Sequence, residues 1–101
     1  MNPLLKGPPP THPGEVLRED VLPALGKNNT EIAKLLGISR PTLYGILAGR
    51  QAVTVPMAYK IGKLTGTNPE LWSRMQLNYD LRTQAPAAEA IDCIPTLEAA
   101  A

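Results

Sequence analysis

The 101-residue sequence contains no phenylalanine and only one each of tryptophan, histidine and cysteine. The lone Cys93 excludes an intramolecular disulfide and has no second cysteine with which to hold a metal cluster. Hydrolytic enzymes commonly use histidine, an activated cysteine or clustered carboxylates in a pocket, whereas His12 and Cys93 fall at or outside the edges of the fold expected below. We therefore expect a protein that is not an enzyme and that holds no metal or other cofactor.

Long hydrophobic runs are also missing, although 44% of the residues are hydrophobic. The longest apolar run covers only a few residues, so no transmembrane helix is expected, and the first residues lack the apolar stretch of a secretory signal. Because aromatic residues are few, the core must consist mainly of Leu, Ile, Val, Ala and Met, as is common in helical domains. These features predict a single cytoplasmic domain with one modest core and no contact with a membrane.

The formal net charge is only +1, but the charges are unevenly distributed. Residues 27–63 carry six Lys and Arg against the single acid Glu31, while the segments on both sides have a net negative charge. A basic centre favours a polyanion as partner, and an exposed helical surface with scattered lysines remains the alternative.

Proline and the loss of periodicity mark the two ends of the domain. Four prolines lie within residues 1–12, which predicts a flexible Pro-rich arm over residues 1–11. Residues 83–101 show no sustained periodicity, so we expect a disordered or loosely docked tail there. The folded domain is then expected over residues 12–82.

Five helices are predicted between these ends, and no run alternates as a strand does. The first begins at Pro13, is distorted or ended by Pro23, and closes at Gly26. The next four are expected to start at capping residues, with Asn28 and Glu31 resembling a capping box. These caps are Asn28 for residues 29–36, Ser39 for a helix to about Leu47, Thr54 for a helix closed by Gly66, and Asn68 for the last helix. The expected fold class is a compact, five-helix, all-α domain.

The second and third helices have the spacing of a helix-turn-helix arrangement. Ala33 is small enough for two helices to cross closely, Gly37 can make the turn, and Ile38 can fill the angle beneath it. Leu43, Ile46 and Leu47 then hold the third helix against the core. The outer face is expected to consist of Pro41, Gly45 and Ala48 with Thr42 and Tyr44 beside them, and to enter the major groove of DNA.

Arg40 is the strongest candidate for reading a base, because a guanidinium can form paired hydrogen bonds with guanine; a phosphate contact is the alternative. Thr42 can contact a thymine methyl group, and Tyr44 can reach a phosphate or pack against the neighbouring turn. Pro41 and Gly45 complete the expected base-reading face, with Gly45 allowing either a closer approach or a weaker readout. The residues expected to contact the DNA backbone are Lys27, Asn29, Ser39, Arg50 and Thr54. For Ser39, helix capping is expected to be the main role.

The fifth helix has more apolar residues than one helical stripe needs. They are expected to serve partly as core and partly as the interface with a second copy. These dimer-interface candidates are Leu71, Trp72, Met75, Tyr79 and Leu81. His12 is expected to lie at the start of the first helix rather than to act as a ligand or base.

The pattern of the central motif resembles the phage-repressor (XRE) helix-turn-helix family over about residues 28–52, which implies a lambda-repressor-like fold. The residues that carry this resemblance are Ala33, Gly37, Ile38, Leu43, Ile46, Leu47 and Gly49. The flanks, His-Pro-Gly-Glu-Val-Leu-Arg-Glu at 12–19, Gly66-Thr67, Glu70-Leu71-Trp72 and Leu77-Asn78-Tyr79-Asp80-Leu81, extend it to residues 12–82 and are similar to HigA-type antitoxins. Gly45 departs from relatives with a polar side chain there, and Asn29 from relatives with Gln.

The resemblance implies a toxin–antitoxin function. Such antitoxins neutralise a small basic ribonuclease toxin that cleaves translated messenger RNA, and they bind double-stranded operator DNA as dimers to repress their own operon. On electrostatic grounds, Glu15, Glu19 and Asp20 of the first helix are candidates for the toxin contact. A stand-alone phage-type repressor remains the alternative, and a short basic reading frame beside the gene would favour the antitoxin.

Overall fold

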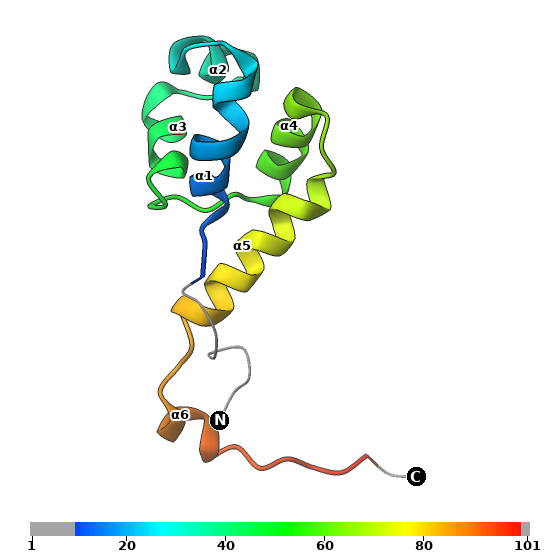
Figure 1. Cartoon of the computed structure of the whole chain (residues 1–101). Helices are drawn as coiled ribbons and strands as arrows, with labels where there is room; N and C mark the ends of the chain where they lie inside the picture. The colour runs from blue at the N-terminus through cyan, green and yellow to red at the C-terminus, as the bar shows by residue number, and fades with distance from the viewer. Residues whose placement is uncertain (1–9, 100–101) are drawn as a thin grey trace.

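The computed structural model describes residues 10–99, so most of the Pro-rich arm expected at residues 1–11 lies outside the described residues. The regular elements within the described range are all helices, with no strand among them, and this confirms the all-α class (Figure 1). The elements are α1 (Pro13–Val16), the π-helical η2 (Leu17–Val21), the 3-10 helix η3 (Leu22–Leu25), α2 (Asn29–Leu36), α3 (Arg40–Leu47), α4 (Val55–Thr65), α5 (Pro69–Thr83) and α6 (Ala88–Asp92).

The first three elements form one continuous helical stretch whose geometry changes along its length. The backbone N–H of Leu22 donates to the carbonyl oxygen of Leu17, five residues earlier, and a 3-10 turn containing Pro23 follows. Proline has no N–H to continue the α-helical ladder, so the distortion expected at Pro23 is confirmed. Gly26 ends the stretch with a φ of 65°, a left-handed conformation that glycine adopts without steric cost.

Helices α2 to α5 begin at the four capping residues predicted from the sequence. The side chains of these residues, Asn28, Ser39, Thr54 and Asn68, each accept a hydrogen bond from a backbone N–H in the first turn. The reciprocal half of the expected capping box is replaced by an ion pair, because the Glu31 carboxylate lies 3.6 Å from Lys27 Nζ.

The core lies where the helices cross, and it is almost entirely aliphatic. Its largest fully buried side chain is Trp72, whose ring nitrogen donates to Thr67 Oγ1 at 2.7 Å. Gly62 lets α4 approach the turn before α5, since a Cβ there would lie 2.7 Å from the carbonyl oxygen of Thr67. The other buried hydrophobic residues are Leu17, Leu22, Ile32, Ala33, Leu36, Leu43, Ile46, Leu47, Val53, Met57, Ala58 and Ile61.

A buried glutamine of α5 holds the segment between α3 and α4. Gln76 Oε1 accepts a hydrogen bond of 2.7 Å from the backbone N–H of Val53, and Gln76 Nε2 donates to Asp80 at 2.9 Å. A buried amide is stable only with its partners in place, so these bonds hold the segment before α4 against α5.

Beyond α5 the structure differs from the five-helix expectation. Residues 88–92 form the short helix α6, which lies apart from the globular part of the molecule (Figure 1). All residues from 83 to 99 are exposed. The sequence missed α6 because five residues are too few to show helical periodicity.

Candidate nucleic-acid interface

The turn between α2 and α3 fixes the angle of the third helix. Gly37 has a φ of 70°, and its N–H donates to Lys34 O at 3.1 Å, while the N–H of Ile38 donates to Ala33 O at 3.0 Å. Two such bonds close a helix in the Schellman arrangement. Ile38 packs against the core from beneath the turn, as the sequence predicts.

The N-terminal end of α3 leaves its outer residues accessible. Leu43, Ile46 and Leu47 are buried, whereas Arg40, Pro41 and Tyr44 are exposed and Thr42 is half-buried. Helix α3 can therefore present its first turn to a partner while its inner face holds the core.

Two hydroxyl groups at this end form a defined pair. Ser39 Oγ accepts from the backbone N–H of Thr42 at 3.2 Å and donates to Thr42 Oγ1 at 2.8 Å. The Ser39 hydroxyl is thus engaged within the cap. The hydroxyl hydrogen of Thr42 remains available to an acceptor outside the protein.

Gly45 does not form the open centre of the outer face that the sequence suggested. The residue is buried, and a Cβ built on it would meet Gln51 Oε1 and lie 3.3 Å from Gln51 Cβ. The Gln51 side chain covers this position in the free protein, and both expectations for Gly45, a closer approach of DNA or a weaker readout, stay predictions.

The turn after α3 places Gln51 there. Gly49 has a φ of 76°, and the carbonyl oxygen of Gly45 accepts from the N–H groups of both Arg50, at 2.9 Å, and Gln51, at 3.1 Å. The chain folds back over its own helix, so Gln51 joins the outer face of α3. Gln51 was not identified from the sequence. The signal that could have indicated it is the presence of Gly45 within the helix together with Gly49 just after its end.

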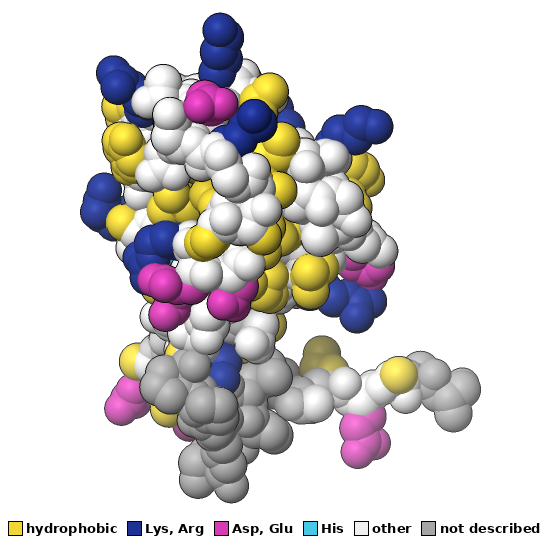
Figure 2. Space-filling model, turned by 45° about the horizontal axis from the view of Figure 1, so that its top comes forward, with side chains coloured by type: hydrophobic (Ala, Val, Ile, Leu, Met, Phe, Trp, Pro, Cys, Tyr) yellow, Lys and Arg dark blue, Asp and Glu magenta, His cyan; other side chains and the backbone are white. Residues whose placement is uncertain are grey.

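The expected backbone-contact residues surround the motif without forming a single patch. Lys27, Arg50 and Thr54 are exposed, and Asn29 is half-buried at the first position of α2. Thr54 Oγ1 is engaged as the cap of α4, accepting from Met57 N at 3.3 Å. In Figure 2 the Lys and Arg side chains stand apart around the globular part, with one acidic side chain among them at the top and others lower down.

The five dimer-interface candidates on α5 differ in how far they are exposed. Trp72 is only 1% exposed, so the prediction that it contributes to the dimer interface is wrong, because the whole indole is buried in the core. Met75 and Tyr79 are half-buried, and Met75 packs against the core. Leu71 and Leu81 are exposed. Leu77, which was not among the five interface candidates, is 59% exposed.

His12 connects the start of α1 with α5. Its Nδ1 accepts a hydrogen bond of 2.9 Å from the backbone N–H of Gly14. Its ring packs edge-on against the Tyr79 ring, with the two ring centroids 4.9 Å apart. Burial lowers the pKa of His12, while Asp80 and a backbone hydrogen bond with Gln51 oppose that shift. This geometry agrees with the expected role of His12 at the helix start.

The acidic candidates Glu15, Glu19 and Asp20 are all exposed. Arg18 lies among them, donating to Glu19 Oε1 at 2.9 Å and to the carbonyl oxygen of Leu47 at 3.1 Å. Arg18 thereby connects this acidic surface to the last turn of α3.

The part of the chain that the structure describes contains no group of three or more residues suited to hold a metal ion. Within residues 10–99, no helix has the length and apolar character needed to cross a membrane.

Comparison with known proteins places this geometry in a family. A helix-turn-helix family model matches residues 17–72. Virulence-associated protein A' of Dichelobacter nodosus is 41% identical over 78 residues, which is 76% of this chain and 65% of that relative's length. Other relatives are described as uncharacterized HTH-type transcriptional regulators.

Solved structures of antitoxins share the fold. Antitoxin GraA in complex with its operator has a TM-score of 0.80 at 36% identity, covering 93% of this chain and 97% of that one. Pseudomonas aeruginosa antitoxin HigA with the higBA promoter has a TM-score of 0.73 at 29% identity, covering 88% and 96%. These proteins are regulators and antitoxins rather than enzymes. The chain belongs to the helix-turn-helix family of the XRE type, with HigA- and GraA-type antitoxins as structural neighbours.

Proposed function

We propose that this chain is the antitoxin of a toxin–antitoxin pair, which binds operator DNA as a homodimer and neutralises a small basic ribonuclease toxin. This activity would take place in the cytoplasm, on the nucleoid when the operator is bound. The observation that carries the proposal is a recognition helix with an accessible first turn, set in a fold that matches nearly the full length of antitoxins solved with their operators.

The proposed base contacts come from the outer face of α3. Arg40 is exposed at the first helical position and can pair with guanine O6 and N7, while Thr42 has a hydroxyl hydrogen to offer. Pro41 supplies a rigid apolar contact, and the hydroxyl of Tyr44 can reach a phosphate. Gln51 lies over Gly45 at the centre of this face, and we assign its side chain to the central base contact.

The proposed phosphate contacts surround this face. Lys27, Arg50 and Asn29 offer cationic or amide donors, and the backbone at the starts of α2 and α4 adds N–H groups near Asn29 and Thr54. Ser39 contributes mainly by holding the start of α3 through its cap.

The proposed dimer contact uses the exposed side of α5. Leu71, Leu77 and Leu81 are exposed there, and Met75 and Tyr79 border it. The proposed toxin contact is the acidic surface of Glu15, Glu19 and Asp20, whose charge is opposite to that of a basic ribonuclease.

Two experiments test the two halves of the proposal. A gel shift with the DNA upstream of the chain's own gene should give a complex that excess unrelated DNA does not displace. Loss of binding in Arg40→Ala, with binding retained in Lys34→Ala, which changes an exposed lysine of α2 outside all the proposed contacts, would support α3 as the reading helix.

The toxin half is tested by co-expression with the adjacent reading frame. We expect the neighbouring product to arrest growth alone, and this chain to restore growth and to co-purify with it. A Glu19→Lys variant that still co-purifies and restores growth would remove the acidic surface from the toxin contact.

A stand-alone transcriptional regulator is the second candidate. It is favoured by relatives described as HTH-type transcriptional regulators, for which no toxin is named. A neighbouring product without effect on growth, together with retained operator binding, would select this function.

A further inference from the structure

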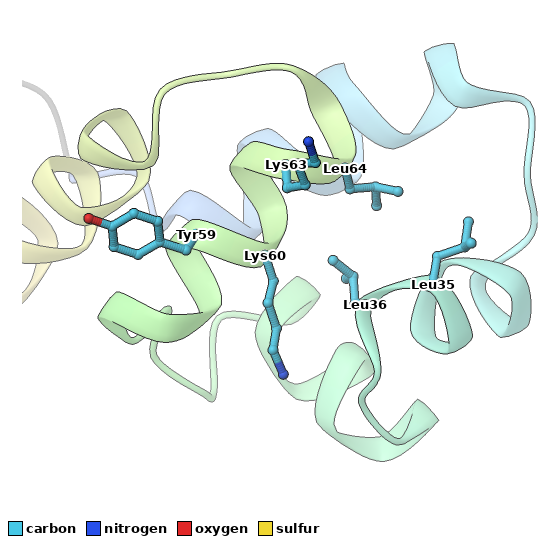
Figure 3. A pocket seen from close by; sticks show the side chains of 6 residues that line it. All are labelled: Leu35, Leu36, Tyr59, Lys60, Lys63 and Leu64. Carbon is cyan, nitrogen blue, oxygen red and sulfur yellow. The ribbon is translucent and has the colours of Figure 1, made fainter.

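An apolar groove lies between α2 and α4. Its volume is about 560 Å³, and none of the proposed DNA, dimer or toxin contacts lines it. Figure 3 shows Leu35 and Leu36 of α2 and Leu64 of α4 directed into the same space. The lining is completed by Tyr59, Lys60 and Lys63 of α4.

The groove is unusual in combining exposed apolar side chains with positive charge. Leu35 is 58% exposed and Tyr59 is 65% exposed, although both are large enough to gain from burial. The two lysines beside them are exposed and take part in no ion pair within residues 10–99. An occupant should therefore be apolar and acidic.

The C-terminal segment, residues 84–99, has this chemistry. It carries Glu89, Asp92 and Glu98 without a lysine or arginine. Ile91, Ile94 and Leu97 follow one another at three-residue intervals, and all are exposed, Leu97 to 85%. None of these side chains is buried against the chain's own fold.

We infer that the C-terminal segment of a second copy of this chain docks in the α2–α4 groove, with its aliphatic residues on Leu35, Leu36 and Leu64 and its carboxylates near Lys60 and Lys63. Charge complementarity carries the assignment, because the groove contributes two positive charges and the segment three negative ones. The groove is too small for a folded domain and large enough for several aliphatic side chains.

The length of the chain favours a second copy over the chain's own tail. Helix α5 spans 15 residues, about 22 Å, and leads away from α4 toward α6 (Figure 1). Residues 84–87 fully extended and α6 in its helical form together return at most about 21 Å. Ile91 therefore falls short of its own groove, which lies on the far side of α4 from α5. The chain's own tail could place at most Ile94 and Leu97 there, whereas a second copy can place all three aliphatic residues.

The lone cysteine allows a direct test on the full chain, because Cys93 lies between Ile91 and Ile94 and is exposed. One sample carries a spin label on Cys93. It is mixed with a nitrogen-15-labelled Cys93→Ser chain, and the amide signals of the second chain are followed. We expect selective broadening at Leu35, Leu36 and Leu64.

Matched variants then test the charges. Lys60→Glu/Lys63→Glu in the nitrogen-15 chain should weaken the contact by about tenfold and remove the broadening, as two lost ion pairs would. Lys34→Glu, an exposed lysine of α2 outside the groove, should leave it unchanged. Glu89→Lys/Asp92→Lys in the spin-labelled chain should restore the broadening when that chain is mixed with the Lys60→Glu/Lys63→Glu chain. Circular dichroism confirms that each variant is folded.

Three results would overturn the inference. Broadening that appears only when label and isotope share one chain would assign the groove to the chain's own tail. Broadening that survives Lys60→Glu/Lys63→Glu would show that the two lysines do not hold the segment and would remove the charge complementarity on which the assignment depends. Absence of groove broadening up to about 1 mM chain would mean that the segment does not bind there. DNA is absent from the experiment, so its outcome is independent of the proposed operator binding.

Discussion

Arg40 occupies the first position of α3, where the Ser39 cap fixes the backbone and leaves the guanidinium exposed. We predict that Arg40→Ala loses about 1–3 kcal/mol of discrimination at one base pair, because a bidentate guanine contact contributes that much. The measurement is competition binding against operators with single base changes. Thermal unfolding should be unchanged, since the side chain packs against nothing in the core.

Arg50→Ala is the matched control, because Arg50 is an exposed arginine placed by the turn after α3. Arg50→Ala should weaken binding to all DNA sequences alike and reduce the slope of log affinity against log salt by about 0.9. If Arg40→Ala behaves in this second way, Arg40 contacts phosphate and another residue reads the base.

Gln51 and Gly45 give a second prediction at the residue scale. Gly45→Ala forces the Gln51 side chain to move, since a Cβ at position 45 would occupy the place of its Oε1. We expect Gly45→Ala and Gln51→Ala to relax sequence preference at the same base pair, and the double variant to be no worse than either single change. The measurement is a binding selection from randomised operators.

A structural role would give a different result. Helix α3 already favours alanine over glycine by about 0.5–1 kcal/mol, so Gly45→Ala should not lower the melting temperature strongly. A large loss of stability in Gly45→Ala with unchanged base preference would contradict a reading role for Gln51.

His12 makes stability depend on pH. Its pKa in the folded protein lies below the ordinary value of 6.5, because burial disfavours the imidazolium. The unfolded chain therefore takes up a proton first as the pH falls. The stability gained from the neutral ring is complete above pH 6.5 and decreases as the pH drops toward the folded pKa.

We predict that His12→Asn flattens this dependence, because asparagine keeps an oxygen for the Gly14 N–H and does not titrate. Urea unfolding at a series of pH values between 6.5 and about 5 measures the slope. An equal slope in both proteins would show that His12 is not the responsible group.

At the scale of the elements, the caps and turns were predictable because each depends on neighbouring residues. Asn28, Ser39, Thr54 and Asn68 each bond to a backbone N–H two or three residues ahead. Such local chemistry is written in short stretches of sequence. The limits of α2 agree with the expected 29–36 for this reason.

Other features of the elements depend on contacts that are distant in sequence. The bond from the Val53 N–H to Gln76 spans 23 residues, so no local pattern indicated that a polar residue of α5 is buried. Helix α5 carries apolar residues on two sides, and composition alone could not assign Trp72 inward and Leu77 outward. The cover of Gln51 over Gly45 needed the conformation of the turn at Gly49.

At the scale of the whole molecule, the proposed dimer contact of the exposed α5 leucines would make DNA recognition depend on oligomeric state. Leu77 and Leu81 are one helical turn apart and both exposed, which places them on the same outer side of the helix. A homodimer that buries them gains about 1.5–3 kcal/mol for each fully buried leucine. Two recognition helices are then related by a two-fold axis and meet half-sites about one turn of DNA apart.

We predict that Leu77→Glu/Leu81→Glu gives a monomer by light scattering, whereas Val55→Glu, a matched change of an exposed residue on α4, keeps the wild-type mass. The monomer should still bind a half-site, because α3 is unaltered, but its affinity should no longer depend on the spacing of two half-sites. Operators with two to five inserted base pairs measure this dependence. If the double variant still prefers one spacing, the dimer is held elsewhere, and the α5 face loses its assigned role while α3 keeps its own.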